Sequence, residues 1–81
     1  MSEGLTPEQA ILDLLVRRGP GKTICPSEAA RLIAGPDGDW RSEMGAIHAA
    51  TDALLDADDI RLSWKDTPKE KRRGPYRIAR R

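Results

Sequence analysis

The sequence predicts a single α+β domain over residues 1–81, with three helices, a short strand and a C-terminal β-hairpin. Before residue 57, apolar residues recur at spacings of three and four in three stretches, which is the period of a helix. After residue 59, apolar and polar residues alternate in two stretches, which is the period of a half-buried strand. A chain of 81 residues has room for one domain with a small core.

The first helix is expected to begin after Thr6, which can cap it. Pro7 suits the first helical position, and Gln9 completes a capping box with Thr6. Gly19 ends the helix. Residues 1–5 are expected to form a flexible N-terminus. The predicted core positions of this helix are Ile11, Leu14 and Leu15, backed by Ala10 and Leu12.

A short strand and a second helix come next. Residues 23–25 (TIC) favour a strand but are too few to be stable without partners. Pro26 opens the second helix, with Cys25 at the cap position and Glu28 as the acid of the first turn. The Gly-Pro-Asp-Gly turn at residues 35–38 ends this helix and leads directly into the third.

Residues 39–59 carry the longest run of helical periodicity, and we expect the rest of the chain to pack around them. Asp39 is expected to cap this helix by accepting from the free amides of its first turn. The predicted buried face is Trp40, Met44, Ile47, Thr51, Leu54 and Leu55. The predicted outer side is small and partly acidic: Ser42, Gly45, Ala46, Ala49, Asp52, Ala53 and Asp56.

The C-terminal stretch is predicted to be an antiparallel hairpin. In the first strand Ile60, Leu62 and Trp64 should face inward, and in the second Tyr76 and Ile78 should do so. Residues 66–74 between them are expected to form a polar loop. Helix, short strand, helix, turn, helix and hairpin is the order of the winged helix-turn-helix fold, in which the short strand pairs with the hairpin and the loop is the wing.

Several of these motifs also resemble a known family. The run GPGKTICPSE at residues 19–28, DWR at residues 39–41 with Met44 behind it, and RGPYR at residues 73–77 are similar to a small bacterial family called domain of unknown function 3253. The resemblance covers nearly the whole chain. It implies a winged-helix fold and assigns no biochemical activity.

Basic residues are concentrated at the C-terminal end. Residues 1–59 hold five Lys or Arg against eleven Asp or Glu, whereas residues 60–81 hold nine against two. Such an excess predicts an anionic partner, and a phosphate backbone rewards it through counterion release. We therefore expect contacts to the backbone of double-stranded DNA from Arg61, Lys65, Lys69, Lys71, Arg72, Arg73 and Arg77.

The N-terminal half of the third helix is expected to enter the major groove. Arg41, Ser42 and His48 would face base edges, and Gly45 and Ala49 would permit close approach. Asp52 and Asp56 would repel phosphates, so only the start of the helix can serve. With so few base-reading side chains, a homodimer on two half-sites is the usual route to specificity, and a transcriptional regulator is the expected role.

The alternative hypothesis is a protein–protein interaction module that binds no nucleic acid. The small residues on the outer side of the third helix would let a second helix approach closely. A dimer that is lost on Ala49→Arg would favour this alternative, whereas salt-dependent binding of random duplex DNA would favour the first hypothesis.

Other candidate sites have simpler explanations. Residues 21–23 (GKT) echo a phosphate-binding loop, but the first glycine of that motif would fall at Val16. His48 and Asp52 share a helix face, yet a zinc site needs three or four ligands. Cys25 is best explained as a small hydrophobe. We expect no enzyme, cofactor, metal or small-molecule ligand.

The sequence also predicts a cytoplasmic protein. Its single cysteine cannot form an internal disulfide, and no apolar run approaches the ~20 residues of a membrane span. The N-terminus lacks the basic and apolar regions of a signal peptide.

Overall fold

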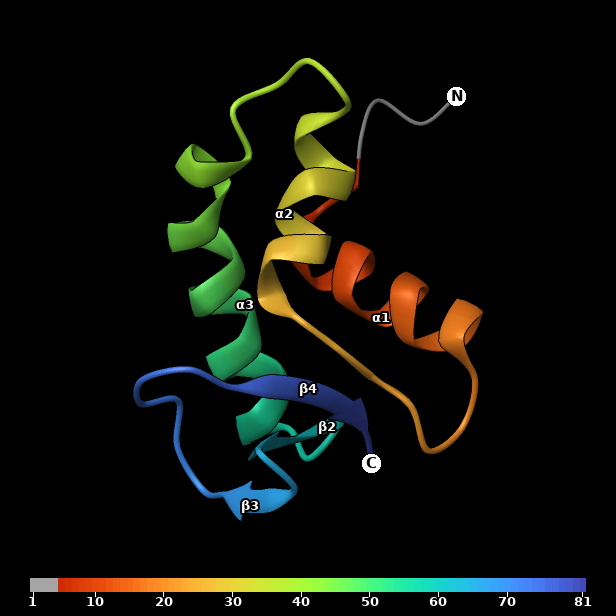
Figure 1. Ribbon diagram of the computed structural model, residues 1–81, viewed down its shortest axis with the longest axis vertical. Helices are drawn as coiled ribbons and strands as arrows, with labels where there is room; N and C mark the ends of the chain where they lie inside the picture. Colours follow the sequence, from red (N-terminus) through yellow and green to blue (C-terminus); the bar gives the residue numbers. More distant parts are fainter. Residues whose placement is uncertain (1–4) are drawn as a thin grey trace.

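Three helices and a four-stranded antiparallel sheet form the domain, as the α+β prediction requires. The computed structural model describes residues 5–81. In Figure 1 the sheet lies at the lower end of the molecule and the helices rise above it. The elements in chain order are α1 (Pro7–Arg18), β1 (Thr23–Ile24), α2 (Pro26–Ala34), the 3₁₀-helix η1 (Trp40–Glu43), α3 (Met44–Asp56), β2 (Ile60–Trp64), β3 (Thr67–Lys69) and β4 (Arg77–Arg80).

The starts of α1 and α2 are fixed by local hydrogen bonds. The Gln9 amide donates to Thr6 Oγ1 at 3.1 Å, and the Thr6 amide donates to Gln9 Oε1 at 3.0 Å. At α2 the Cys25 amide donates to Glu28 Oε2 at 3.0 Å. The predicted capping box and the second helix start at Pro26 are therefore confirmed. The predicted N-terminus, residues 1–5, lies outside the described residues except for Leu5, which packs partly buried against the core.

The predicted start of the third helix was wrong. Asp39 makes no side-chain capping bond, and the α-helix begins only at Met44, after the four residues of η1. The Ser42 hydroxyl donates instead to the Asp39 carbonyl at 2.8 Å. The turn is tight because Gly38 packs on the end of α2, where a Cβ would lie 2.1 Å from the Ala34 carbonyl oxygen. This close approach delivers the chain into a 3₁₀ turn.

The two sides of α3 otherwise follow the prediction, and the helix ends at Asp56. Ile47, Thr51 and Leu54 are buried, and the Thr51 hydroxyl is satisfied by donating to the Ile47 carbonyl at 2.8 Å. Half-buried side chains extend this face: Trp40, Met44 and Leu55. All seven residues predicted for the outer side are exposed.

The sheet has the order β1-β4-β2-β3, with every neighbouring pair antiparallel. β2 pairs with β4 in a register that places Leu62 opposite Ile78, and β1 pairs with β4 through Ile24 and Ile78. These three side chains are buried beneath the helices with Tyr76. The predicted hairpin and its pairing with the short strand are therefore confirmed.

The connection between β2 and β4, residues 65–76, differs from the polar loop predicted for residues 66–74. Residues 67–69 form β3 and pair with β2, with Trp64 opposite Thr67. Lys65 and Asp66 make the turn between them with φ of 52° and 67°, the left-handed values of a two-residue hairpin turn. Trp64 is 38% exposed, contrary to the prediction, because it is the last residue of β2 before this turn.

No helix within residues 5–81 is long and apolar enough to cross a membrane.

Candidate nucleic-acid interface

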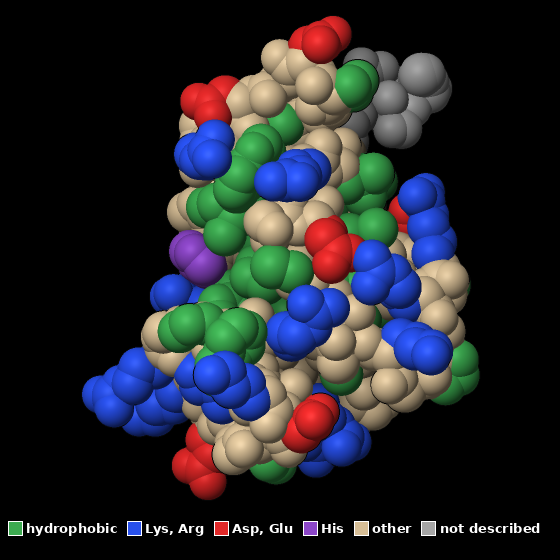
Figure 2. Space-filling model, in the orientation of Figure 1, with side chains coloured by type: hydrophobic (Ala, Val, Ile, Leu, Met, Phe, Trp, Pro, Cys, Tyr) green, Lys and Arg blue, Asp and Glu red, His purple; other side chains and the backbone are tan. Residues whose placement is uncertain are grey.

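The outer side of α3 is exposed along the length of the helix. In Figure 1 this helix forms one edge of the molecule, and the β2–β4 connection projects beyond the same edge. Figure 2 shows His48, the single histidine, on this edge, with basic side chains above and below it. Four exposed residues on this side of α3 are small: Gly45, Ala46, Ala49 and Ala53.

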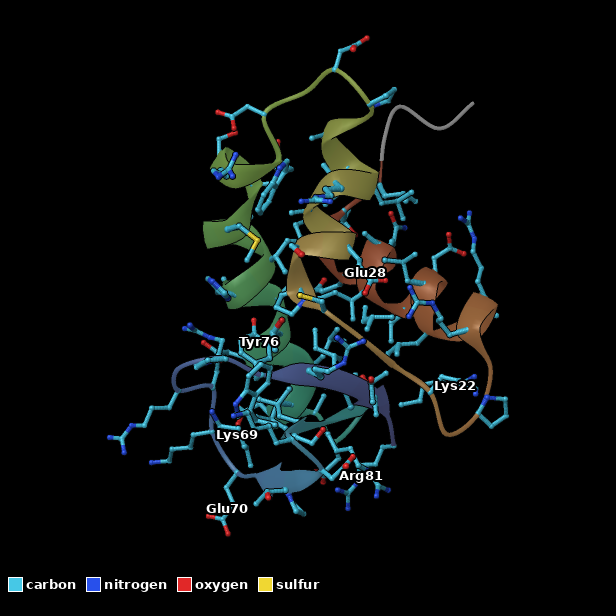
Figure 3. All side chains as sticks on the ribbon, viewed as in Figure 1. Lys22, Glu28, Lys69, Glu70, Tyr76 and Arg81 are labelled. Atoms are coloured by element: carbon cyan, nitrogen blue, oxygen red, sulfur yellow. The ribbon has the colours of Figure 1, made fainter. Side chains whose placement is uncertain are left out.

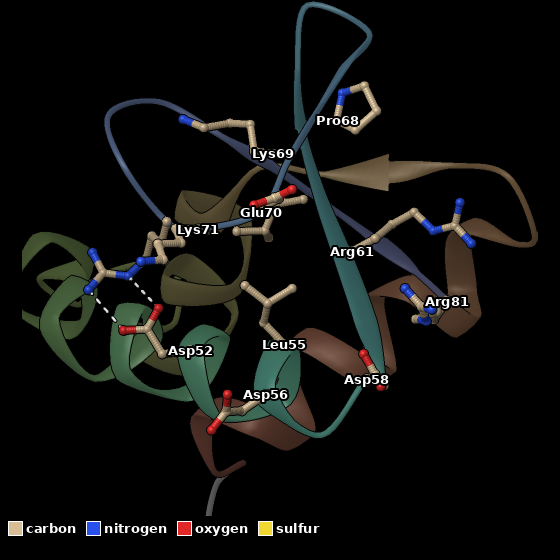
Figure 4. A pocket seen from close by; sticks show the side chains of 12 residues that line it. Asp52, Leu55, Asp56, Asp58, Arg61, Pro68, Lys69, Glu70, Lys71 and Arg81 are labelled. Carbon is tan, nitrogen blue, oxygen red and sulfur yellow. Dashed lines mark hydrogen bonds and ion pairs between the residues drawn. The ribbon is translucent and has the colours of Figure 1, made fainter.

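An ion pair joins α3 to the β2–β4 connection. Arg72 donates twice to Asp52, from Nε to Oδ1 and from a terminal nitrogen to Oδ2, both at 3.0 Å (Figure 4). This two-point geometry is the strong form of an arginine–carboxylate contact. The hydrogen bonds from Arg72 lower the pKa of Asp52 below its usual value. Asp52, predicted to repel phosphates, is therefore neutralised in place.

A second contact joins the same two elements. His48 Nδ1 lies 2.7 Å from the Tyr76 hydroxyl, and the two rings are tilted with centroids 5.8 Å apart. Figure 3 shows Tyr76 where the connection meets the sheet, beside α3. Burial and the positive charge of Arg72 lower the pKa of His48, so the imidazole is neutral at pH 7. Its Nε2 is the ring nitrogen that this contact leaves unused.

Two of the residues predicted to contact phosphates are bonded to other groups of the protein. Lys69 donates to the carbonyl of Arg73 and to that of Pro75, at 3.0 Å for Pro75, and so holds the connection in shape. Arg77 donates from Nε to Thr23 Oγ1 at 2.7 Å and lies 3.9 Å from Glu28. It thereby ties β4 to β1 and α2. Lys69, Arg72 and Arg77 therefore each donate hydrogen bonds to other groups of the protein.

The other predicted phosphate contacts are exposed, and within residues 5–81 they form no ion pair. They are Arg61, Lys65, Lys71 and Arg73. Lys71 and Arg61 both line an open groove of about 1010 Å³, whose wall also includes Asp52, Leu55 and Asp56 of α3. In Figure 4 Arg61 lies beside Arg81 and Asp58, away from the Asp52–Arg72 pair. Both side chains therefore border a groove beside α3, with Lys71 nearer to the Asp52–Arg72 pair than Arg61.

At the other end of α3, Arg41 stacks on an aromatic ring. The Arg41 guanidinium carbon lies 4.5 Å from the centroid of Trp40, and that of Arg31 lies 4.6 Å from the same centroid. Both arginines are exposed, and the indole is half-buried between α2 and η1. Ser42 is also exposed, with its hydroxyl donating to Asp39. Sequence reasoning missed Arg31, because no local pattern predicts a contact between residues nine apart in two helices.

Comparison with known proteins identifies a family. The family model described as "Protein of unknown function (DUF3253)" matches residues 5–81. The chain belongs to this family. The match covers every described residue, including both ends of α3 and the β2–β4 connection. No curated protein matches the chain.

Proposed function

We propose that this member of the DUF3253 family is a winged-helix module that binds double-stranded DNA. The order of its elements and the pairing of β1 with the β2/β4 hairpin support a winged-helix arrangement, with α3 as the recognition helix and the β2–β4 connection as the wing. The observation that carries the proposal is the uncovered outer side of α3 next to a basic connection. A major groove of about 12 Å width admits such a helix.

The shape and charge of α3 suit close approach to DNA. Gly45 and Ala49 are exposed, so base edges and sugars could come near the helix backbone. Arg72 neutralises Asp52, which removes the charge that would have opposed a phosphate at this position. Lys71 and Arg73 remain as exposed cations on the same connection. Their contribution is to sequence-independent affinity through counterion release.

Base reading falls to the first turns of α3 and to η1. His48 is half-buried and contacts Tyr76 through Nδ1, which leaves Nε2 for a partner, and Ser42 is exposed. Arg41, the third base contact predicted from the sequence, lies in η1. A neutral imidazole and a hydroxyl are weak discriminators, so a homodimer on two half-sites remains the expected route to specificity. A role in transcription regulation and a cytoplasmic location are part of the same proposal.

The test is a fluorescence titration of a labelled random duplex at several salt concentrations. The parent protein should bind with Kd of about 10⁻⁴–10⁻⁶ M, and log K should fall linearly with log salt. Changing Lys71 and Arg73 together to Ala should make the slope shallower by about 1.8, which is ~0.9 for each lost phosphate contact. The matched control changes Arg17 and Lys22 to Ala, two exposed cations on or after α1.

No binding by the parent at 10⁻⁴ M, the weak end of about 10⁻⁴–10⁻⁶ M for non-specific association, would refute the proposal. An equal change of slope in the α1 control would show that net charge, and not the connection, sets the affinity.

A protein–protein interaction module is the second candidate, favoured by the exposed run of Gly45, Ala46, Ala49 and Ala53 on α3. Small residues let helices approach closely, so this surface would suit a second copy or another helical partner. Analytical ultracentrifugation tests it: a concentration-dependent dimer that Ala49→Arg abolishes, with no DNA binding by the parent, would replace the first proposal.

A further inference from the structure

We propose that Arg31 and Arg41, held by Trp40, form a second DNA-backbone contact at the opposite end of α3 from the β2–β4 connection. DNA would then be held by phosphates at both ends of the helix. The inference rests on the proposed function and extends it. It gives Arg41 a phosphate in place of the base edge expected from the sequence, and it adds Arg31, which that expectation did not include.

The stacking geometry leaves the arginines able to bind. A guanidinium group over an indole uses its flat face, and its five N–H donors lie in the plane of the group and stay available. The guanidinium carbons of Arg41 and Arg31 lie over the Trp40 ring, 4.5 Å and 4.6 Å from its centroid, and this cation–π contact uses no N–H···O hydrogen bond. Planar forked donors match phosphate oxygens, and a restrained side chain loses less entropy on binding.

Arg31 and Arg41 differ from Arg72 of the connection in their partners. Arg72 forms an ion pair with Asp52, whereas no carboxylate in residues 5–81 forms one with Arg31 or Arg41. Three acidic residues lie near this pair in the sequence: Asp37, Asp39 and Glu43. They make the local electrostatic potential less positive. The pair is therefore suited to short-range contact with a phosphate that is already close. Long-range attraction falls to the basic connection.

The two clusters lie toward opposite ends of α3. α3 has 13 residues, so it is about 20 Å long at ~1.5 Å per residue. η1, which carries Trp40 and Arg41, precedes its first residue, and Arg72 meets it at Asp52 near its other end. In Figure 2 basic side chains flank a hydrophobic patch over α2 and η1, and others cover the connection. A helix in a major groove about 12 Å wide has a phosphate strand on each side, so clusters toward its two ends could contact different strands.

The test uses the same titration with the full chain. Changing Arg31 and Arg41 together to Ala should make the salt slope shallower by about 1.8, and this loss should add to that of the Lys71 and Arg73 variant. Both arginines are exposed, so the melting temperature should stay near that of the parent. The matched control is again the pair Arg17→Ala and Lys22→Ala, which should leave the slope unchanged.

Two outcomes would overturn the inference while leaving the proposed function intact. Parent-like slope and affinity in the Arg31/Arg41 variant would show that neither residue touches a phosphate. An unchanged slope with loss of about tenfold or more in discrimination between two duplex sequences would return Arg41 to base reading. Absence of DNA binding by the parent would remove both proposals together.

The role of Trp40 has its own readout. Trp40→Leu keeps every charge but removes the ring, so the slope should stay the same while the affinity falls severalfold. The melting temperature is measured in parallel. If this variant unfolds, Trp40→Met serves in its place, because it also keeps an apolar side chain and removes the ring. Parent affinity in whichever of the two variants remains folded would show that stacking on the indole does not position the arginines.

Discussion

The two ends of α3 are held by different chemistry. In its C-terminal half, Leu54 is buried in the core and Asp52 bonds to Arg72 of the β2–β4 connection, and one turn earlier His48 contacts Tyr76. At the start, the helix has no side-chain cap, and Trp40 and Met44 are only half-buried. Arginine residues occur at both ends, but one pairs with a carboxylate and the others stack on a ring.

This difference separates charges that hold the fold from charges that are free to meet a partner. The two-point bond between Arg72 and Asp52 satisfies the guanidinium and anchors the connection on α3. Stacking of Arg31 and Arg41 on Trp40 orients the groups and leaves their N–H donors open. A count of basic residues along the chain cannot make this distinction, because it depends on which neighbour each arginine meets.

The largest expected effect concerns burial at the two ends. Leu54 is 7% exposed, so Leu54→Ala should lower the free energy of unfolding by about 2–5 kcal/mol. Met44→Ala, at the half-buried start of the helix, should cost clearly less. Chemical denaturation of both variants measures this. Equal losses would show that the start of α3 is as firmly packed as its C-terminal end.

The next effect concerns caps. Thr6→Ala should cost about 1 kcal/mol, because it removes a side chain that accepts from Gln9. Asp39→Ala should cost under about 0.5 kcal/mol, because the Asp39 side chain makes no capping bond. Thermal melts of the two variants decide the matter, and a larger loss for Asp39 than for Thr6 would restore the cap predicted from the sequence.

A smaller effect on stability, with a clear effect on binding, is expected at the ion pair. Arg72→Ala should cost ~0.2–1 kcal/mol of stability, as for other solvent-exposed pairs. It should weaken DNA binding more than Lys71→Ala, because it also uncovers the charge of Asp52. Adding Asp52→Asn to Arg72→Ala should then recover part of the affinity. If the double variant binds no better than Arg72→Ala, the Asp52 charge has no influence on DNA.

The smallest effect is a dependence on pH. Because burial lowers the pKa of His48 in the folded protein from 6.5, the folded state binds its proton less readily than the unfolded chain. The neutral His48 therefore contributes stability that is complete above pH 6.5 and is lost as the pH falls below that value. Melting temperatures at pH 7.5 and pH 5 should therefore differ less in His48→Gln than in the parent. An identical difference in both would assign the pH dependence elsewhere.

Local sequence signals predicted most of the fold. The capping box of Thr6 and Gln9 and the alternation of Ile60 with Leu62 involve residues close in the chain, so their partners could be named in advance. The strand at residues 67–69 could not, because three residues that include a proline become a strand only once β2 is beside them. The 3₁₀ start of the third helix likewise depends on how Gly38 packs against α2.

The candidate site was predicted less completely. The basic connection and the small outer side of α3 were evident from composition and periodicity. The pairing of Arg72 with Asp52 joins residues 20 apart, and the contact of Arg31 with Trp40 crosses from one helix to another. Only the packed fold shows that Arg72 pairs with Asp52 and that Arg31 lies beside Trp40 at the start of the third helix.

Amide chemical-shift mapping by NMR during titration with a short duplex tests the central claim most directly. If α3 is held on DNA at both ends, the largest shifts should occur in η1 and the first turns of α3, around Arg31, and in residues 71–73. Residues of α1 such as Arg17, on an element outside the proposed surface, should shift little. Shifts confined to residues 71–73 would contradict the contact at the start of α3, and uniform or absent shifts would contradict the account as a whole.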